Sequence, residues 1–261
     1  MNDVTRRRME LNIRDDAQKI IDAAINAALP DTAVKKALKG VDFSGGRLLL
    51  VAIGKASWSM AKAARDLLKD QIHEGIVITK YDHSQGDLPN IRVFEGGHPV
   101  PDDNSFMATE EAIKLVSNLS PDDKVLFLIS GGGSALFEKP LISKESLENI
   151  TEQLLASGAN IVEMNTIRKR LSAVKGGRFA KLCEPAQVFS VVLSDIIGDP
   201  LDMIASGPAY PDSSTSEQAL FIIKKYGIKL PTEAKELLLE ETPSILNNVT
   251  TKITGSVTQL C

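Results

Sequence analysis

Residues 124–140 read KVLFLISGGGSALFEKP and contain the strongest chemical signal in this sequence. An apolar run stops at Ser130, three glycines follow, and the apolar run resumes after Ser134. Ordered glycine costs backbone entropy, so three in a row need a compensating role. Their N–H groups can turn inward to bind an anion, with two serine hydroxyls as further donors. A tight turn that serves only packing is the alternative. The predicted phosphate-binding residues are Ser130, Gly131, Gly132, Gly133 and Ser134.

A lysine follows an earlier apolar run, at the end of VAIGK. The stretch is not a P-loop, because that motif needs glycine where Leu49 stands and serine or threonine where Ala56 stands. A lysine between the carboxyl end of a strand and a helix can still hold its ammonium near an anion that faces the helix. We therefore predict that Lys55 contacts a phosphate group, with a solvated surface lysine as the alternative.

A basic run, NTIRKRLSAVKGGRFAKL, occupies residues 165–182 of a chain with net charge −4. Charge runs are usually solvated faces. Here, however, Gly176 and Gly177 interrupt the run and allow a close approach of the backbone to a ligand. We therefore favour binding of a polyanion or a carboxylate, with Arg168 suited to bidentate contact and Lys175 to a point charge.

An aspartate, Asp195, directly follows the apolar run QVFSVVLS. A carboxylate in this place can orient a substrate hydroxyl, accept its proton, or hold Mg²⁺ through water. We predict a catalytic role for Asp195. Three later aspartates are instead typical of turns and caps, and these are Asp199, Asp202 and Asp212.

Strand-like and helix-like segments alternate along the chain. Apolar segments predict strands at 47–54, 75–80, 91–97, 124–130 and 187–195. Helical periodicity predicts helices at 15–29, 56–70, 104–119, 143–157, 159–172, 215–227 and 231–241. Strands that are apolar on both faces and separated by helices indicate a doubly wound α/β fold, with a mostly parallel sheet covered on both faces. No linker or repeat divides residues 1–261, so we expect one domain.

The predicted fold brings the candidate residues together. Ligands of such sheets bind outside the carboxyl ends of the strands. Lys55, the glycine turn and Asp195 each follow a predicted strand. We therefore expect them to surround one pocket.

Composition favours a small-molecule function. A net charge of −4, a pI near 5.5 and 5% aromatic residues argue against a nucleic-acid surface. Cys183 and Cys261 show neither metal-ligand spacing nor a disulfide framework. No apolar segment predicts a leader or a membrane span, so we expect a cytoplasmic location. The oligomeric state stays open, and a homo-oligomer is among the alternatives.

Five motifs together resemble those of the type II glycerate kinase family, in the same order. They are GKASWSMA, EGGHPVPDDNS, SGGGSALFEKP, NTIRKRLSAVKGGRFAKL and LSDIIGDPLDMIASGPAYPD. The resemblance runs from about residue 15 to the end of the chain. It implies phosphorylation of D-glycerate to 2-phosphoglycerate by ATP and Mg²⁺, on a Rossmann-like domain paired with a smaller C-terminal α/β domain.

The resemblance also assigns residues. Lys55 matches the family's glycine-lysine position, which faces the transferred phosphate, and Asp195 matches its strand-end aspartate. The glycine turn matches the family's glycine-rich loop. Arg168 and Lys175 match basic positions that we assign to substrate binding, to hold the carboxylate of glycerate. His98, in GGHPVPD, is either part of a constrained turn or a catalytic base.

Two departures from the family pattern stand out. Ala209 follows SGP, where the family often has threonine. The sequence ends at TTKITGSVTQLC without the smaller C-terminal domain, so we expect residues 1–261 to be an N-terminal domain that pairs with that domain in the intact protein, and to be weakly active alone.

Two other functions remain open. A sugar-phosphate-binding module would use the same glycine turn without turnover. A hydroxypyruvate reductase would need a dinucleotide site, but the G-x-G-x-x-G pattern fails because Leu136 stands at its last glycine. The residues that would hold the metal stay open.

Overall fold

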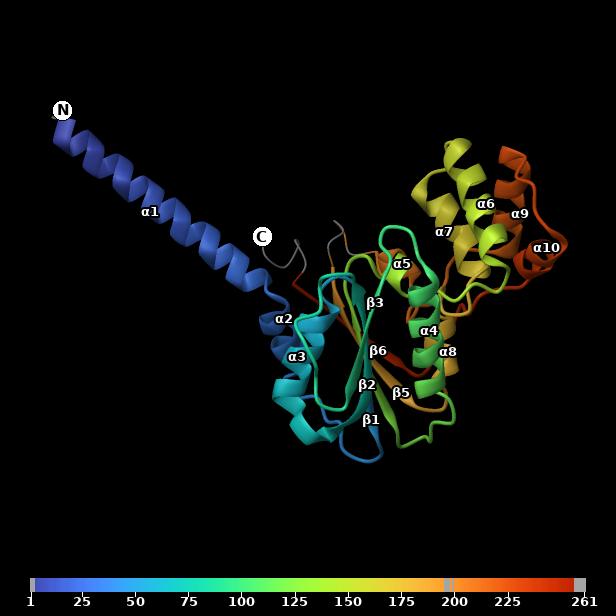
Figure 1. Ribbon diagram of the computed structural model, residues 1–261, viewed down its shortest axis with the longest axis horizontal. Helices are drawn as coiled ribbons and strands as arrows, with labels where there is room; N and C mark the ends of the chain where they lie inside the picture. The colour runs from blue at the N-terminus through green and yellow to red at the C-terminus, as the bar shows by residue number, and fades with distance from the viewer. Residues whose placement is uncertain (1–2, 195–197, 199, 256–261) are drawn as a thin grey trace.

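A computed structural model describes residues 3–194, 198 and 200–255 (Figure 1). Its centre is a sheet of six parallel strands, so the predicted doubly wound, Rossmann-like α/β fold is confirmed. The sheet has no antiparallel member among the described strands, whereas the sequence predicted a mostly parallel one. The strands are β1 (Leu48–Ile53), β2 (Ile72–Lys80), β3 (Ile91–Gly96), β4 (Lys124–Ile129), β5 (Gln187–Leu193) and β6 (Val249–Thr254).

The strand order is β3-β2-β1-β4-β5-β6. The chain winds outward in one direction from β1 and in the other from β4, so the order reverses between these two strands. Ile53 pairs with Ile129 where both strands end. The loops after β1 and β4 therefore begin side by side at the topological switch point, where ligands of such folds bind.

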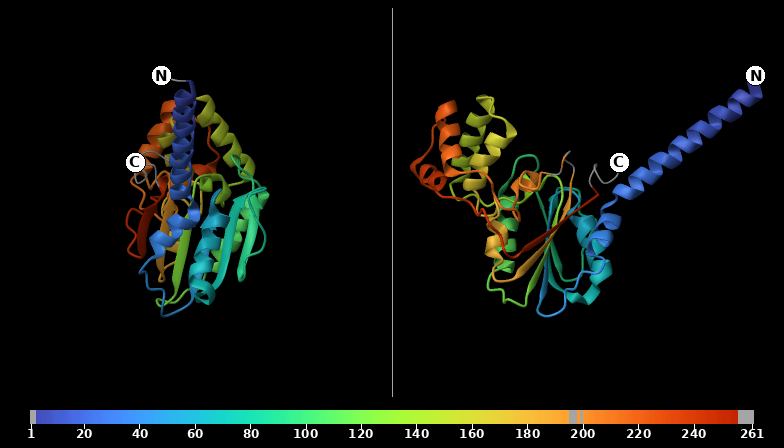
Figure 2. Two further views of the ribbon diagram at one scale, coloured as in Figure 1. Left: turned by 90° about the vertical axis from the view of Figure 1, so that its left-hand side faces the viewer. Right: turned by 180° about the vertical axis from the view of Figure 1, so that it is seen from behind.

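Helices cover both faces of the sheet (Figures 1 and 2). Successive side chains of β1 point to opposite faces, and all six are buried, which explains the unbroken apolar run. Leu48, Leu50 and Ala52 pack with α2 (Pro30–Leu38) and α3 (Ser57–Leu68). The alternate residues pack with α4 (Asp103–Leu115) and α8 (Arg178–Leu182).

Four further helices form a group beside the sheet, at the upper right of Figure 1. They are α6 (Lys144–Ala156), α7 (Ile161–Arg170), α9 (Ser216–Tyr226) and α10 (Thr232–Leu239). They share a hydrophobic core of their own, which includes Leu154, Ile167 and Leu238. The sequence predicted these helices, but not that they pack on one another.

The helix α1 (Asp3–Ala28) projects from the body (Figures 1 and 2). The sequence predicted an apolar stripe here that includes Ile20 and Ile21, yet Ile20 is 70% exposed and Ile21 is 50% exposed. This stripe therefore covers no part of the sheet.

Short 3-10 turns occur at η1 (Lys69–Gln71) and η2 (Ile204–Ser206). Among the described helices, none combines the length and hydropathy that a membrane crossing needs.

Candidate functional site

The tips of β1 and β4 are tied together by hydrogen bonds. The backbone N–H of Lys55 donates to the carbonyl of Gly131 at 2.9 Å. The N–H of Ala56 donates to Ser130 Oγ at 3.1 Å, and that hydroxyl donates to the carbonyl of Ile53 at 3.2 Å. These bonds fix Lys55 beside the glycine turn, as the sequence led us to expect.

Gly132 is the point where three parts of the site touch. Its φ is +86°, and a Cβ there would lie 3.0 Å from His98 Cδ2 and 3.1 Å from Lys55 Cγ. Glycine is required both by the backbone conformation and by this close approach. The His98 ring and the Lys55 side chain therefore lie against the turn, so His98 belongs to the site geometrically.

The turn offers backbone donors. Within the described part of the chain, the N–H groups of Gly131, Gly132 and Ser134 have no acceptor. Gly133, by contrast, donates to the Ser130 carbonyl at 3.4 Å and begins the short helix α5 (Gly133–Leu136). Adjacent N–H groups without acceptors form the type of nest that binds anions.

The two serine hydroxyls have other partners, which the sequence did not predict. Ser130 donates to the Ile53 carbonyl. Ser206 Oγ donates to Asn165 Oδ1 at 3.2 Å, so in the 2.8 Å contact between Ser134 Oγ and Ser206 Oγ the proton comes from Ser134. At the glycine turn itself, the donors that remain for a ligand among the described residues are therefore backbone N–H groups rather than the two serine hydroxyls.

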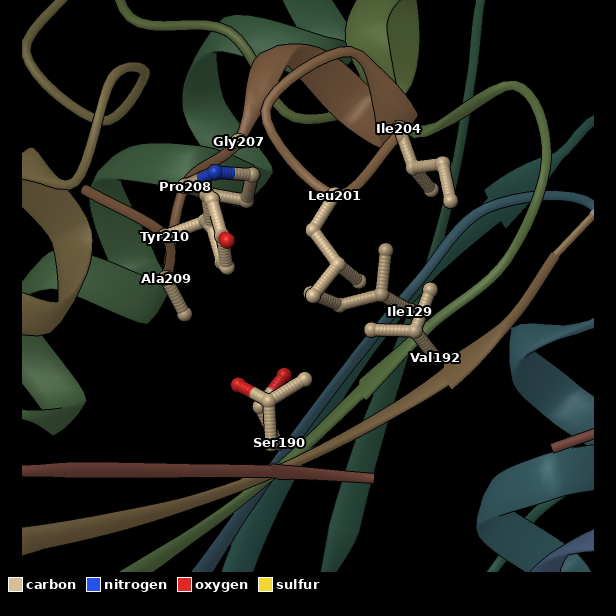
Figure 3. Close-up of a pocket in the computed structure, with 10 residues that line it drawn as sticks. Ile129, Ser190, Val192, Leu201, Ile204, Gly207, Pro208, Ala209 and Tyr210 are labelled. Atoms are coloured by element: carbon tan, nitrogen blue, oxygen red, sulfur yellow. The ribbon is translucent and has the colours of Figure 1, made fainter. Parts of the chain in front are cut away.

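A pocket of about 260 Å³ opens next to Lys55 at the tips of β1, β4, β5 and β6. It is lined by Lys55, Ala56, Ser130, Gly131, Leu193, Ser194 and Gly255. The next residue after Ser194 is Asp195, which lies outside the described residues, so its predicted role stays a prediction. Figure 3 shows a different cavity, between β5 and the loop at 201–210, of about 10 Å³. That space suits one water molecule and no substrate.

Lys175 is completely buried, which does not suit the direct ligand contact predicted for it. Its Nζ donates to the carbonyls of Ser134 at 2.8 Å and Phe137 at 3.0 Å, and lies 2.8 Å from Glu138 Oε2. Burial lowers the pKa of Lys175 to about 8, against the opposing effect of the Glu138 charge. The ammonium thus holds α5 in place through these carbonyls. Its role in substrate binding stays a prediction.

The other cations of the basic run divide into two kinds. Lys169 lies 3.1 Å from Asp212, and Arg170 lies 3.0 Å from Glu241, so both are structural ion pairs. Asp212 also accepts from the Ser214 N–H, in agreement with the turn role predicted for it. Arg168, in contrast, is half-buried and has no ion-pair partner among the described residues. The positive charge of Arg168 helps to lower the pKa of the nearby Lys175 ammonium.

Sequence reasoning missed two buried residues at the site. Asn165 and Ser206 link α7 and the loop at 203–208 to Ser134 on α5. The signal that could have identified Asn165 is its position at the start of the basic run NTIRKR. Ser206 gave none, because only the fold brings it within reach of residue 134.

The described residues do not form a protein metal site. No group of three or more His, Cys, Asp or Glu side chains converges within residues 3–194, 198 and 200–255. Magnesium in nucleotide sites is often held by one or two carboxylates and the substrate phosphates. The donors at the glycine turn are backbone N–H groups and the Lys55 ammonium, which suit an anion.

Comparison with known proteins supports this interpretation. The family model described as "Domain of unknown function (DUF4147)" matches residues 16–239. The chain is 50% identical to the D-glycerate 2-kinase of Thermotoga maritima, over 94% of this chain and 59% of that protein. It is 42% identical to a putative hydroxypyruvate reductase of Agrobacterium vitis, over 90% of this chain and 54% of that protein.

Solved structures show the same similarity. The crystal structure of glycerate kinase from Thermotoga maritima matches with a TM-score of 0.91 and 49% identity, over 96% of this chain and 60% of that chain. The chain thus spans about 60% of the length of its relatives of known structure. On its sequence, its fold and its switch-point site, the chain belongs to the glycerate kinase family, in the part that the DUF4147 domain covers.

Proposed function

We propose that this chain serves the ATP-dependent phosphorylation of D-glycerate to 2-phosphoglycerate in the cytoplasm. One observation carries the proposal: Lys55 lies against a glycine turn at the switch point of a parallel sheet, and N–H groups of that turn have no acceptor among the described residues. Relatives named glycerate kinases support the same choice of reaction.

The residues have the following proposed roles. The N–H groups of Gly131, Gly132 and Ser134 bind phosphate oxygens, and Lys55 offsets their negative charge during transfer. Arg168, at the end of α7, is proposed to bind the polyanionic phosphates of the nucleotide substrate. Asp195 orients or deprotonates the C2 hydroxyl. Transfer of a phosphoryl group depends mainly on positioning and on charge stabilisation, which such a site supplies.

Lys175 has a supporting role in this proposal. Its hydrogen bonds to the carbonyls of Ser134 and Phe137 hold α5 in place. The orientation of α5 sets the direction of the N–H groups at its start. Mg²⁺ would arrive bound to the phosphates of ATP.

We also propose that the chain is the N-terminal domain of a longer enzyme. The relatives extend beyond the part that this chain spans. A further C-terminal α/β domain would then form a second wall of the site.

The function is tested with the 261-residue chain, ATP, Mg²⁺ and D-glycerate, with ³¹P NMR to identify the product. We expect slow formation of 2-phosphoglycerate. Lys55→Ala should lower kcat by about 10²- to 10³-fold, as loss of one charge-stabilising group does. Lys62→Ala is the control, since Lys62 is exposed on α3 and pairs only with Asp66.

Three results would contradict the proposal. An unchanged rate in Lys55→Ala would remove the role of Lys55. Binding of 2-phosphoglycerate without any turnover on prolonged incubation would indicate a binding module. Oxidation of NADH by hydroxypyruvate would favour the reductase activity named for the Agrobacterium vitis relative.

A further inference from the structure

Four basic side chains gather on the β2–β3 side of the glycine turn. Lys80 ends β2 and pairs in register with Gly96 at the end of β3. His83 Nδ1 lies 3.0 Å from the carbonyl of Lys55. The His98 ring and the Lys55 side chain both lie against Gly132. We call Lys55, Lys80, His83 and His98 the basic cluster.

Within the part of the chain that the structure describes, Lys55 and Lys80 of the basic cluster form no salt bridge. Burial lowers the pKa of His98, and the charges of Lys55, Lys80 and His83 lower it further. Two carboxylates of this region accept hydrogen bonds from uncharged donors and keep their own charge. Asp102 accepts from the Tyr81 hydroxyl at 2.6 Å, and Glu95 accepts from the Ser84 N–H at 2.9 Å. Asp82 is exposed in the turn after β2. The ammonium groups of Lys55 and Lys80 are therefore the charges of this cluster that can attract an anion.

Except for Lys55, the residues of the basic cluster do not line the pocket of about 260 Å³. That pocket opens toward Leu193, Ser194 and Gly255 on the β5–β6 side. Lys55 belongs to both, because it lines the pocket and also lies beside His98 over Gly132. A kinase for an acidic acceptor must hold two anions, the phosphates and the acceptor's carboxylate, with the transferred group between them. The two sides of Lys55 meet that requirement.

We propose that the basic cluster binds the carboxylate of the acceptor, a short hydroxy acid, while the pocket on the other side of Lys55 takes the phosphates. This inference rests on the proposed function. It moves the carboxylate site from Arg168 and Lys175, which the sequence suggested, to the β2–β3 side. The imidazole of His98 and the ammonium of Lys80 then act as donors to the carboxylate oxygens.

Histidine NMR on the 261-residue chain tests the proposal with an internal control. The chain has three histidines, and His73 lies near the start of β2, about 20 Å along the strand from Lys80. D-Glycerate should shift the ring signals of His98 and leave those of His73 unchanged. A bound carboxylate favours the imidazolium, so the pKa of His98 should rise on binding. Affinity should consequently increase as pH falls through the pKa of His98 in the complex.

Variants test the same site by affinity. His98→Gln and Lys80→Gln should each weaken D-glycerate binding about tenfold, the scale of one lost charge-assisted hydrogen bond. His73→Gln should not weaken it. If His98→Gln fails to fold, Lys80→Gln at the end of its strand gives an independent answer.

Inorganic phosphate, followed on the amide signals of Gly131 and Gly132, separates this inference from the proposed function. Phosphate that shifts these amides, together with D-glycerate that leaves His98 unmoved, would overturn the carboxylate site alone. D-Glycerate that shifts Arg168 and not His98 would do the same. If neither D-glycerate nor phosphate shifts any site signal, the proposed function itself fails.

Discussion

At the scale of single residues, Gly132 shows why the turn is glycine. Its positive φ alone would strain any L residue by about 1 to 2 kcal/mol. A methyl group would in addition press on His98 and Lys55 at 3.0–3.1 Å. The sequence indicated the first reason, since glycine runs are typical of such turns. The second reason depends on His98 and Lys55, which lie 34 and 77 residues before Gly132 in the sequence.

We predict that Gly132→Ala weakens phosphate binding and lowers the free energy of unfolding. Gly158→Ala is a matched control, because Gly158 has a similar φ of +77° with no atom within 4 Å of the added methyl. Both variants carry the conformational cost, and Gly132→Ala should cost roughly 1 kcal/mol more through overpacking. Urea unfolding and phosphate titration measure the two effects. Equal losses in both variants would show that the contacts of Gly132 are unimportant.

The buried pair of Lys175 and Glu138 gives a second prediction. Within the described residues, the Lys175 ammonium is the polar partner of the Glu138 carboxylate. Lys175→Met should therefore lower the free energy of unfolding by about 3 to 5 kcal/mol, because it leaves a buried charge unpaired. The double variant Lys175→Met/Glu138→Gln should lose less than the sum of the single variants.

A double-mutant cycle from urea unfolding checks this coupling. The exposed pair of Lys62 and Asp66 on α3 is the comparison, with an expected coupling below about 1 kcal/mol. Additive losses for Lys175 and Glu138 would mean that the two charges do not depend on each other. The sequence could not reveal this pair, since a lysine in a basic run gives no sign that the fold encloses it.

At the scale of elements, α4 holds the loop that carries His98. Asp102 caps α4 by accepting from the Ser105 N–H at 2.9 Å, and it also accepts from the Tyr81 hydroxyl. Burial alone would raise the pKa of Asp102, but hydrogen bonds from Tyr81, Ser105 and Gly97 lower it to about 2. The cap therefore favours the ionised form in the folded state.

The sign of the resulting pH dependence follows from linkage. The folded-state pKa of Asp102, about 2, is below its ordinary value of 3.8, so its stabilisation is present above pH 3.8 and is lost as pH falls toward 2. Asp102→Asn should remove roughly 1 to 2 kcal/mol at pH 6 and flatten the decline between pH 4 and 2. Urea unfolding across this range measures it, with Asp66→Asn as an exposed control. An unchanged acid profile would contradict the prediction.

The elements themselves were largely readable from the sequence. Every predicted strand was confirmed, because buried parallel strands are apolar on both faces and end at glycine or charged residues. The helices were readable from their periodicity, and the structure adds capping boxes at Asn160 and Thr215. Periodicity does not state what a helix packs against. The separate core of α6, α7, α9 and α10 and the exposed stripe of α1 were for that reason not foreseen.

At the scale of the whole molecule, topology explains why distant motifs share a site. The strand order places the ends of β1 and β4 together, and the register of β2 with β3 brings Lys80 beside the His98 loop. A phosphate site and an acceptor site can then lie on either side of Lys55. The sequence indicated the proposed phosphate site through its glycines, whereas the residues of the proposed acceptor site fall in separate segments of the sequence, at positions 55, 80, 83 and 98.

The last prediction concerns turnover by the chain alone. Kinases typically turn over at about 1 to 100 s⁻¹, with the reacting groups enclosed on all sides. The pocket beside Lys55 is lined here by strand tips and loops, and the relatives extend beyond the part that this chain spans. We therefore expect the 261-residue chain to bind phosphate but to turn over roughly 100-fold or more slowly than the Thermotoga maritima enzyme assayed beside it. Equal rates would show that the site is complete in this chain, and would remove the need for a second domain.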